Sequence, residues 1–67
     1  MKFKAENGYI ELIKLLKVTG LCSTGGAAKV VTEEGLVKVD GEVEYRKRRK
    51  IKKGQRVEFD GETILVE

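Results

Sequence analysis

The sequence predicts an α+β domain, in which two packed helices lie beside a small antiparallel sheet of about four short strands. Three observations lead to this prediction. The chain has 67 residues, which suits a single domain spanning residues 1–67. Apolar residues recur at helical spacing in its first half and alternate with polar residues in its second half. The pairs Asp40-Gly41 and Asp60-Gly61 are strong hairpin-turn signals that divide the second half into strands.

The first helix is predicted over residues 9–18. Leu12, Leu15 and Leu16 fall on one face at spacings of three and four residues, which is the pattern of an amphipathic helix. Gly20 is placed to end this helix, because glycine adopts the left-handed conformation of a C′ position without strain.

The second helix is predicted over roughly residues 25–34. Ser23 or Thr24 provides its N-cap, since a hydroxyl oxygen can accept from a free amide of the first turn. Gly35 ends the helix. Small residues that permit close helix packing form its apolar side: Ala27, Ala28 and Val31.

Alternation of apolar and polar residues predicts the strands. It appears in residues 36–39 and 42–45, on either side of the first Asp-Gly pair. It appears again in residues 57–59 and 62–66, around the second pair. A glycine-containing turn at residues 53–55 leads into the second hairpin.

Positive charge is concentrated in residues 46–53, which we call the basic segment. All residues of this segment except Ile51 are Lys or Arg, whereas the whole chain has a net charge of only +3. A cluster of one sign costs self-repulsion and is typical of surfaces that bind polyanions. A solvated charged loop and a membrane-surface contact are the alternatives, but so dense a run in so short a chain favours nucleic acid. Ile51 is predicted to anchor the segment to the core.

The composition argues against an enzyme, a metal site and a bound cofactor. The chain has no His and one Cys, so the usual nucleophile–base pairs and metal clusters cannot be built. Cys22 has no partner for an internal disulfide, which favours the reducing cytoplasm. No apolar run approaches the roughly 20 residues that span a bilayer. We therefore expect a cytoplasmic protein without catalytic activity and without a membrane partner.

The stretch from residue 12 to residue 66 resembles a known RNA-binding family, the S-four domain, named after small ribosomal-subunit protein four. The pattern that carries the resemblance is Leu16-Lys17, Gly20-Leu21, Ser23-Thr24-Gly25-Gly26, Ala28-Lys29, Gly35, Val37-x-Val39-Asp40-Gly41 and Gly54-Gln55 with Val57. No single element is specific, but all of them occur in order at the right distances. The chain looks closest to the small stand-alone bacterial members of the family.

The resemblance implies binding of structured RNA, either ribosomal RNA or tRNA, through a helix-loop-strand surface. Carried over by position, this surface includes residues 23–26, Lys29, Lys38 and residues 40–41. The chain departs from many members at Gly25, where they have Arg, and at Asp40, where they have Asn. We infer that the basic segment takes over the binding of phosphate groups. The predicted RNA contacts are Ser23, Thr24, Gly25, Gly26, Lys29, Lys38, Arg46, Lys47, Arg48, Arg49, Lys50 and Lys53.

The residue types at these positions suit phosphate binding. Residues 23–26 precede a helix, whose free amides and dipole attract anions, although simple capping would use the same residues. Lys29 lies at the edge of the apolar face, and Lys38 lies between two valines on the solvent side of its strand; both could be ordinary surface lysines. Guanidinium groups make bidentate bonds, so the arginines of the basic segment are its best ligands, whereas its lysines supply a general field.

Two alternative functions use the same charge. The basic surface could dock an acidic protein partner, as an interaction adaptor, or bind nucleic acid without specificity, including DNA. Aromatic residues are few, which favours recognition of shape and phosphate over stacking on single-stranded bases. Tyr45 is the one stacking candidate that the sequence places beside the basic segment.

Overall fold

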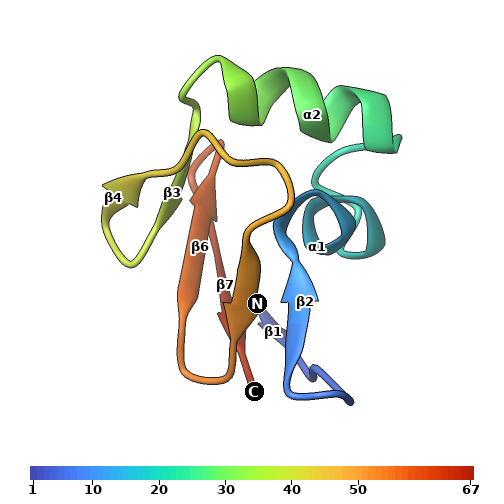
Figure 1. Ribbon diagram of the computed structural model, residues 1–67, viewed down its shortest axis with the longest axis vertical. Coiled ribbons are helices and arrows are strands. Elements are labelled where there is room, and N and C mark those ends of the chain that lie inside the picture. Colours follow the sequence, from blue (N-terminus) through green and yellow to red (C-terminus); the bar gives the residue numbers. More distant parts are fainter.

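The two helices pack against each other at one side of the strands in the computed structural model, which describes residues 1–67 (Figure 1). The elements in chain order are β1 (Lys2–Phe3), β2 (Tyr9–Glu11), α1 (Leu12–Val18), α2 (Gly25–Glu33), β3 (Val37–Val39), β4 (Glu42–Val43), β5 (Lys50–Lys52), β6 (Arg56–Phe59) and β7 (Glu62–Val66). The predicted α+β class is confirmed.

The larger sheet has five strands in the order β1-β7-β6-β3-β4. Strands β3, β4, β6 and β7 are the predicted antiparallel set. The prediction of a purely antiparallel sheet is wrong at β1, which lies parallel to β7 and pairs Lys2 with Leu65. A strand of two residues is too short to show an alternation. Its place is decided by backbone bonds to the other end of the chain, such as the one from the Leu65 amide to the Met1 carbonyl.

A smaller sheet pairs β2 with β5, and it places Ile10 opposite Ile51. The prediction of a helix from residue 9 is therefore wrong at its start, because residues 9–11 form β2 and α1 begins at Leu12. Tyr9 and Ile10 fit a half-buried strand well, because Tyr9 is exposed and Ile10 is buried opposite Ile51 of β5. The helical spacing of the leucines is preserved downstream of this strand.

The predicted end of the first helix and the predicted start of the second are confirmed. Gly20, with φ of +81°, follows the last turn of α1, and the leucines of that helix are buried. Thr24 is the N-cap of α2, where its Oγ1 accepts from the Ala27 amide at 3.0 Å. Neither helix is long and apolar enough to cross a membrane.

One apolar core joins the helices to both sheets. Its buried side chains come from α1, α2 and strands of each sheet. Ile51 is fully buried in it, which confirms the predicted anchor of the basic segment. Cys22 is also buried there as a small apolar filler. Because Ile51 and the α1 leucines share this core, the basic segment is fixed relative to the first helix.

Candidate nucleic-acid interface

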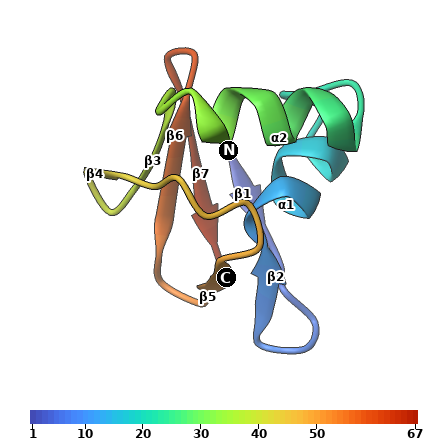
Figure 2. The ribbon, with the colours of Figure 1, turned by 45° about the horizontal axis from the view of Figure 1, so that its top comes forward.

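The basic segment is held to the body through its backbone. The amides of Leu12 and Ile13 donate to the carbonyls of Arg49 at 2.9 Å and Lys47 at 3.1 Å. These amides belong to the first turn of α1, which has no side-chain cap. Figure 2 shows the chain between β4 and β5 crossing the start of this helix. The segment therefore caps α1 with carbonyl groups, and its cationic side chains stay available.

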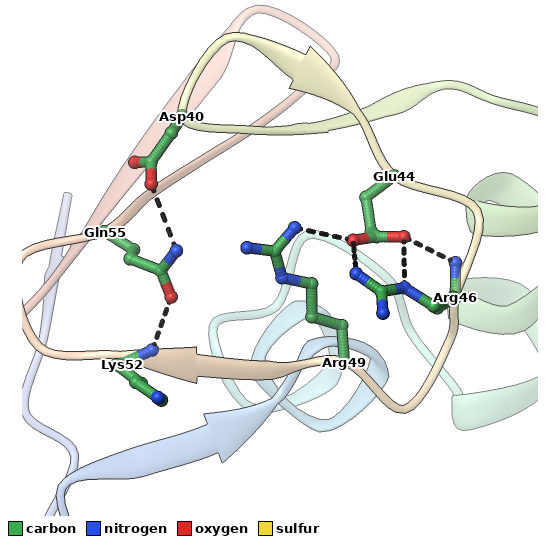
Figure 3. Close-up of polar contacts among 6 residues, drawn as sticks. All are labelled: Asp40, Glu44, Arg46, Arg49, Lys52 and Gln55. Atoms are coloured by element: carbon green, nitrogen blue, oxygen red, sulfur yellow. Dashed lines mark hydrogen bonds and ion pairs between the residues drawn. The ribbon is translucent and has the colours of Figure 1, made fainter.

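Glu44 organises two of the arginines (Figure 3). Its side chain is only 8% exposed. One carboxylate oxygen accepts from the Arg46 amide at 3.0 Å and from Arg46 Nε at 3.1 Å. The other accepts from Arg46 Nη2 at 3.1 Å and Arg49 Nη1 at 2.7 Å. These bonds, those from the Arg46 side chain first, outweigh desolvation and lower the pKa of Glu44 to about 2.

The inward position of Glu44 corrects the strand predicted over residues 42–45. Strand β4 ends at Val43, and both Val43 and Tyr45 are exposed whereas Glu44 is buried. Alternation alone assigned Glu44 to the polar face. Its carboxylate is buried because two guanidinium groups compensate for its desolvation. No sequence signal distinguishes this glutamate from Glu42.

An open hollow of about 600 Å³ lies beside this cluster, and none of its lining residues is hydrophobic. It is lined by Arg46, Arg48, Arg49, Lys50, Lys52 and Gln55. Lys52 and Gln55 were not among the predicted contacts. Gln55 is brought there by the turn that connects β5 to β6.

Asp40 and Gln55 are hydrogen-bonded to each other on the side of the hollow away from Glu44 (Figure 3). Gln55 accepts from the Lys52 amide at 2.8 Å and donates from Nε2 to Asp40 Oδ2 at 3.0 Å. The other Asp40 oxygen accepts from the Arg56 amide at 2.9 Å. This backbone bond, followed by the one from Gln55, lowers the pKa of Asp40. The carboxylate at position 40 thus ties the first hairpin turn to β6, which gives this departure from the family pattern a structural role.

The residues predicted at the start of α2 lie beyond the other end of α1. Ser23, Thr24 and Lys29 are exposed. A side chain at Gly25 would meet no atom within 4 Å, and one at Gly26 would meet only Thr24 Oγ1 at 3.8 Å. Neither glycine has a positive φ, so neither packing nor backbone strain requires it. The seven residues of α1 extend over about 10 Å and separate this group from the basic segment.

Lys38 is not brought to the basic segment. It is exposed on β3, opposite Glu58 of the neighbouring strand β6. It lines a separate hollow that also contains Glu58, Asp60 and Glu62. The acidic side chains around Lys38 offset its charge, so it adds little to a continuous positive surface.

Two tyrosines lie near the positive charge, where only Tyr45 was predicted. Tyr45 is 62% exposed, and its ring passes so close to Gly35 that a Cβ there would lie 3.0 Å from Cε1. Tyr9 lies beside the segment because β2 pairs with β5, and Lys50 Nζ is 4.9 Å from the centre of its ring. Because the predicted helix begins at residue 9, the strand pairing that places Tyr9 beside the segment was not predicted.

Comparison with known proteins identifies the family of this chain. The profile of the S4 domain family matches residues 3–67. YbcJ of Escherichia coli (strain K12) is 50% identical over 58 residues, which cover 87% of this chain and 83% of YbcJ. YbcJ of Shigella flexneri matches to the same extent.

Two solved structures extend the comparison. The solution structure of E. coli YbcJ, described as revealing an ALFAL motif involved in RNA-binding, superposes with a TM-score of 0.73 at 45% identity, covering 97% of this chain and 84% of YbcJ. The 30S ribosomal protein S4e of Thermoplasma acidophilum gives a TM-score of 0.59 at 27% identity, covering 78% of this chain and 26% of that protein. The matched residues include both helices, the strand after them and the basic segment, and the chain belongs to the S4 domain family.

Proposed function

We propose that this protein is a non-catalytic, cytoplasmic binder of structured RNA, either ribosomal RNA or tRNA. The observation that carries the proposal is the fixed basic segment: its carbonyl groups and Ile51 hold it to the body, while its cations line an open hollow without hydrophobic residues. An ordered cationic surface loses less conformational entropy on binding than a mobile charged tail. The RNA-binding motif described for YbcJ, which shares the fold, supports the same conclusion.

The binding surface of this proposal has two parts. The basic segment lies at the start of α1, and residues 23–26 with Lys29 lie beyond its end. Half-buried Gly25 and exposed Gly26 leave room for a phosphate group at the amides of α2. Both parts together would follow one RNA backbone over the length of α1. Lys38 stays outside this surface, among acidic neighbours.

Salt dependence and charge removal test the proposal. Variant Arg48→Gln/Lys53→Gln removes two exposed cations without touching the Glu44 cluster. Its matched control is Lys2→Gln/Lys4→Gln, which removes the same charge from the exposed N-terminal region. Filter binding to ribosomal RNA, bulk tRNA and duplex DNA is measured at several salt concentrations, and proteins that co-purify with the chain are identified after nuclease treatment.

With about six engaged cations, the wild-type plot of log K against log salt has a slope near −4 to −5. We expect the slope of the basic-segment variant to be less steep by about 1 to 2, with the control close to wild type. An equal loss of RNA affinity in both variants would show that binding depends on total charge and not on the basic segment. Retention of an acidic protein after nuclease treatment, with no RNA binding, would favour the adaptor function. Equal affinity for duplex DNA and folded RNA would refute RNA specificity.

A further inference from the structure

The Glu44 cluster leaves many hydrogen-bond donors unused. A guanidinium carries five N–H donors, and Arg49 gives one of them to Glu44. Arg46 uses Nε and Nη2 on the same carboxylate, so its Nη1 group has no partner in the protein. The Glu44 carboxylate accepts four bonds in total, which fills its capacity. The remaining donors of both arginines can therefore bind a second anion while Glu44 stays in place.

The hollow beside the cluster has the composition of an anion site. Five of its six lining residues are Arg or Lys, and none is hydrophobic. Glu44 offsets one of these charges and Asp40, bonded to Gln55, offsets a second, so positive charge remains in excess. The sixth lining residue, Gln55, is held by Asp40 and by the Lys52 amide, so the wall opposite Arg49 is also fixed. The guanidinium forks of Arg46 and Arg49, held by Glu44, and the lysines of the same lining suit a phosphate group, whose oxygens accept from several directions.

We propose that this hollow binds one phosphate group of the RNA backbone, and that Glu44 is the positioning residue that holds Arg46 and Arg49 in their binding orientation. The inference rests on the proposed function and adds to it a defined subsite. Glu44 contributes order: its buried carboxylate reduces the number of conformations that two long side chains lose on binding. Without it, the same charges remain but their donors are no longer aligned.

The test compares two substitutions that change the net charge equally. Glu44→Gln and Glu42→Gln each remove one negative charge, and Glu42 is exposed on β4 without an ion pair. Simple electrostatics predicts that both variants bind ribosomal RNA and bulk tRNA more tightly. Positioning predicts that Glu44→Gln binds about tenfold more weakly, with Glu42→Gln unchanged or tighter. Tighter binding by both variants would overturn the role of Glu44.

A second variant and an NMR measurement distinguish a loss of binding from a loss of folding. Arg49→Lys keeps the charge but loses the planar fork, so we expect it to weaken RNA binding about tenfold as well. In wild-type protein, inorganic phosphate should shift the NMR signals of Arg49 Nε–H and of the Gln55 side-chain amide, whereas chloride at equal ionic strength should not. Folded Glu44→Gln should lose this response.

The two proposals fail in different ways. If wild type, Glu44→Gln and Arg49→Lys bind RNA equally strongly, the phosphate subsite is refuted. The proposed RNA-binding function would still hold. Absence of RNA binding by the wild type would remove the proposed function, and the phosphate titration would then decide the subsite alone. Unchanged Arg49 and Gln55 signals in that titration would refute it.

Discussion

At the scale of single residues, Glu44 organises two arginines of the basic segment. It is buried because Arg46 and Arg49 supply its hydrogen bonds, and it in turn restrains their side chains. A reversal of both arginines to glutamate would place like charges around a buried carboxylate and would unfold this region. Charge-reversal studies of the segment should therefore use Arg48 and the exposed lysines.

Glu44 also gives the protein a defined pH dependence. Its pKa is lowered from 4.5 to about 2, so the ionised form stabilises the folded state above the unfolded value of 4.5. This stabilisation is lost as the pH falls from 4.5 towards about 2. We expect Glu44→Gln to lower the melting temperature at about pH 7, and the difference from wild type to shrink near about pH 2. Thermal melts followed by circular dichroism measure both. A constant difference across this range would contradict the role of the charge.

At the scale of elements, the start of α2 shows a conflict between stability and binding. Gly25 and Gly26 occupy the first turn of a helix, and glycine costs up to about 0.5–1 kcal/mol relative to alanine, the value for a helix interior. Neither residue is needed for packing, since a side chain at either position has room. A destabilising choice without a structural reason points to close approach of a ligand at these amides.

Substitution of one glycine separates the two effects. We expect Gly26→Ala to raise the free energy of unfolding by up to about 1 kcal/mol and to weaken RNA binding several-fold, because a methyl group blocks the amides. Urea denaturation and filter binding measure the two quantities. Val30→Ala, at an exposed position farther along α2, is the control and should leave RNA binding unchanged. Undiminished binding by Gly26→Ala would remove residues 23–26 from the proposed surface.

At the scale of the whole molecule, two sheets and two helices depend on one small core. A domain of this length buries only about 60% of its unfolded surface, so each buried side chain matters. Ile51 and Ile64 are both fully buried, but Ile51 lies in the smaller sheet and Ile64 in the larger one. The basic segment is thus tied to global stability through the burial of Ile51, the pairing of β5 with β2 and two backbone bonds to α1.

Matched core substitutions show whether Ile51 anchors the segment locally. Ile51→Val and Ile64→Val should each cost about 0.5–1.5 kcal/mol. We expect only Ile51→Val to speed amide hydrogen exchange selectively at Leu12 and Ile13, whose amides bond to the basic segment. NMR-detected exchange under native conditions measures this. Equal acceleration at these amides in both variants would show that the segment opens only with the whole domain.

Much of the fold follows from local sequence features. The leucine spacing in α1, the Thr24 cap and the Asp-Gly turns each act over a few residues, and all of them are found where predicted. The predicted helix over residues 9–18 includes strand β2, and the parallel pairing of β1 with β7 is not predicted. Both strands pair with segments distant in sequence, and each is too short for its local pattern to reveal that pairing.

The candidate surface divides in the same way. The sequence by itself determined where the positive charge is concentrated, which residues anchor it and which family the pattern resembles, because charge, periodicity and motif order are properties of the linear chain. Only the tertiary structure decided that Glu44 faces inward, that Gln55 and Tyr9 join the basic segment and that Lys38 lies among acidic residues. The placements of Gln55, Tyr9 and Lys38 depend on strand pairing between residues distant in sequence. The inward position of Glu44 depends on compensation of its buried charge, which the regular alternation of the sequence does not reveal.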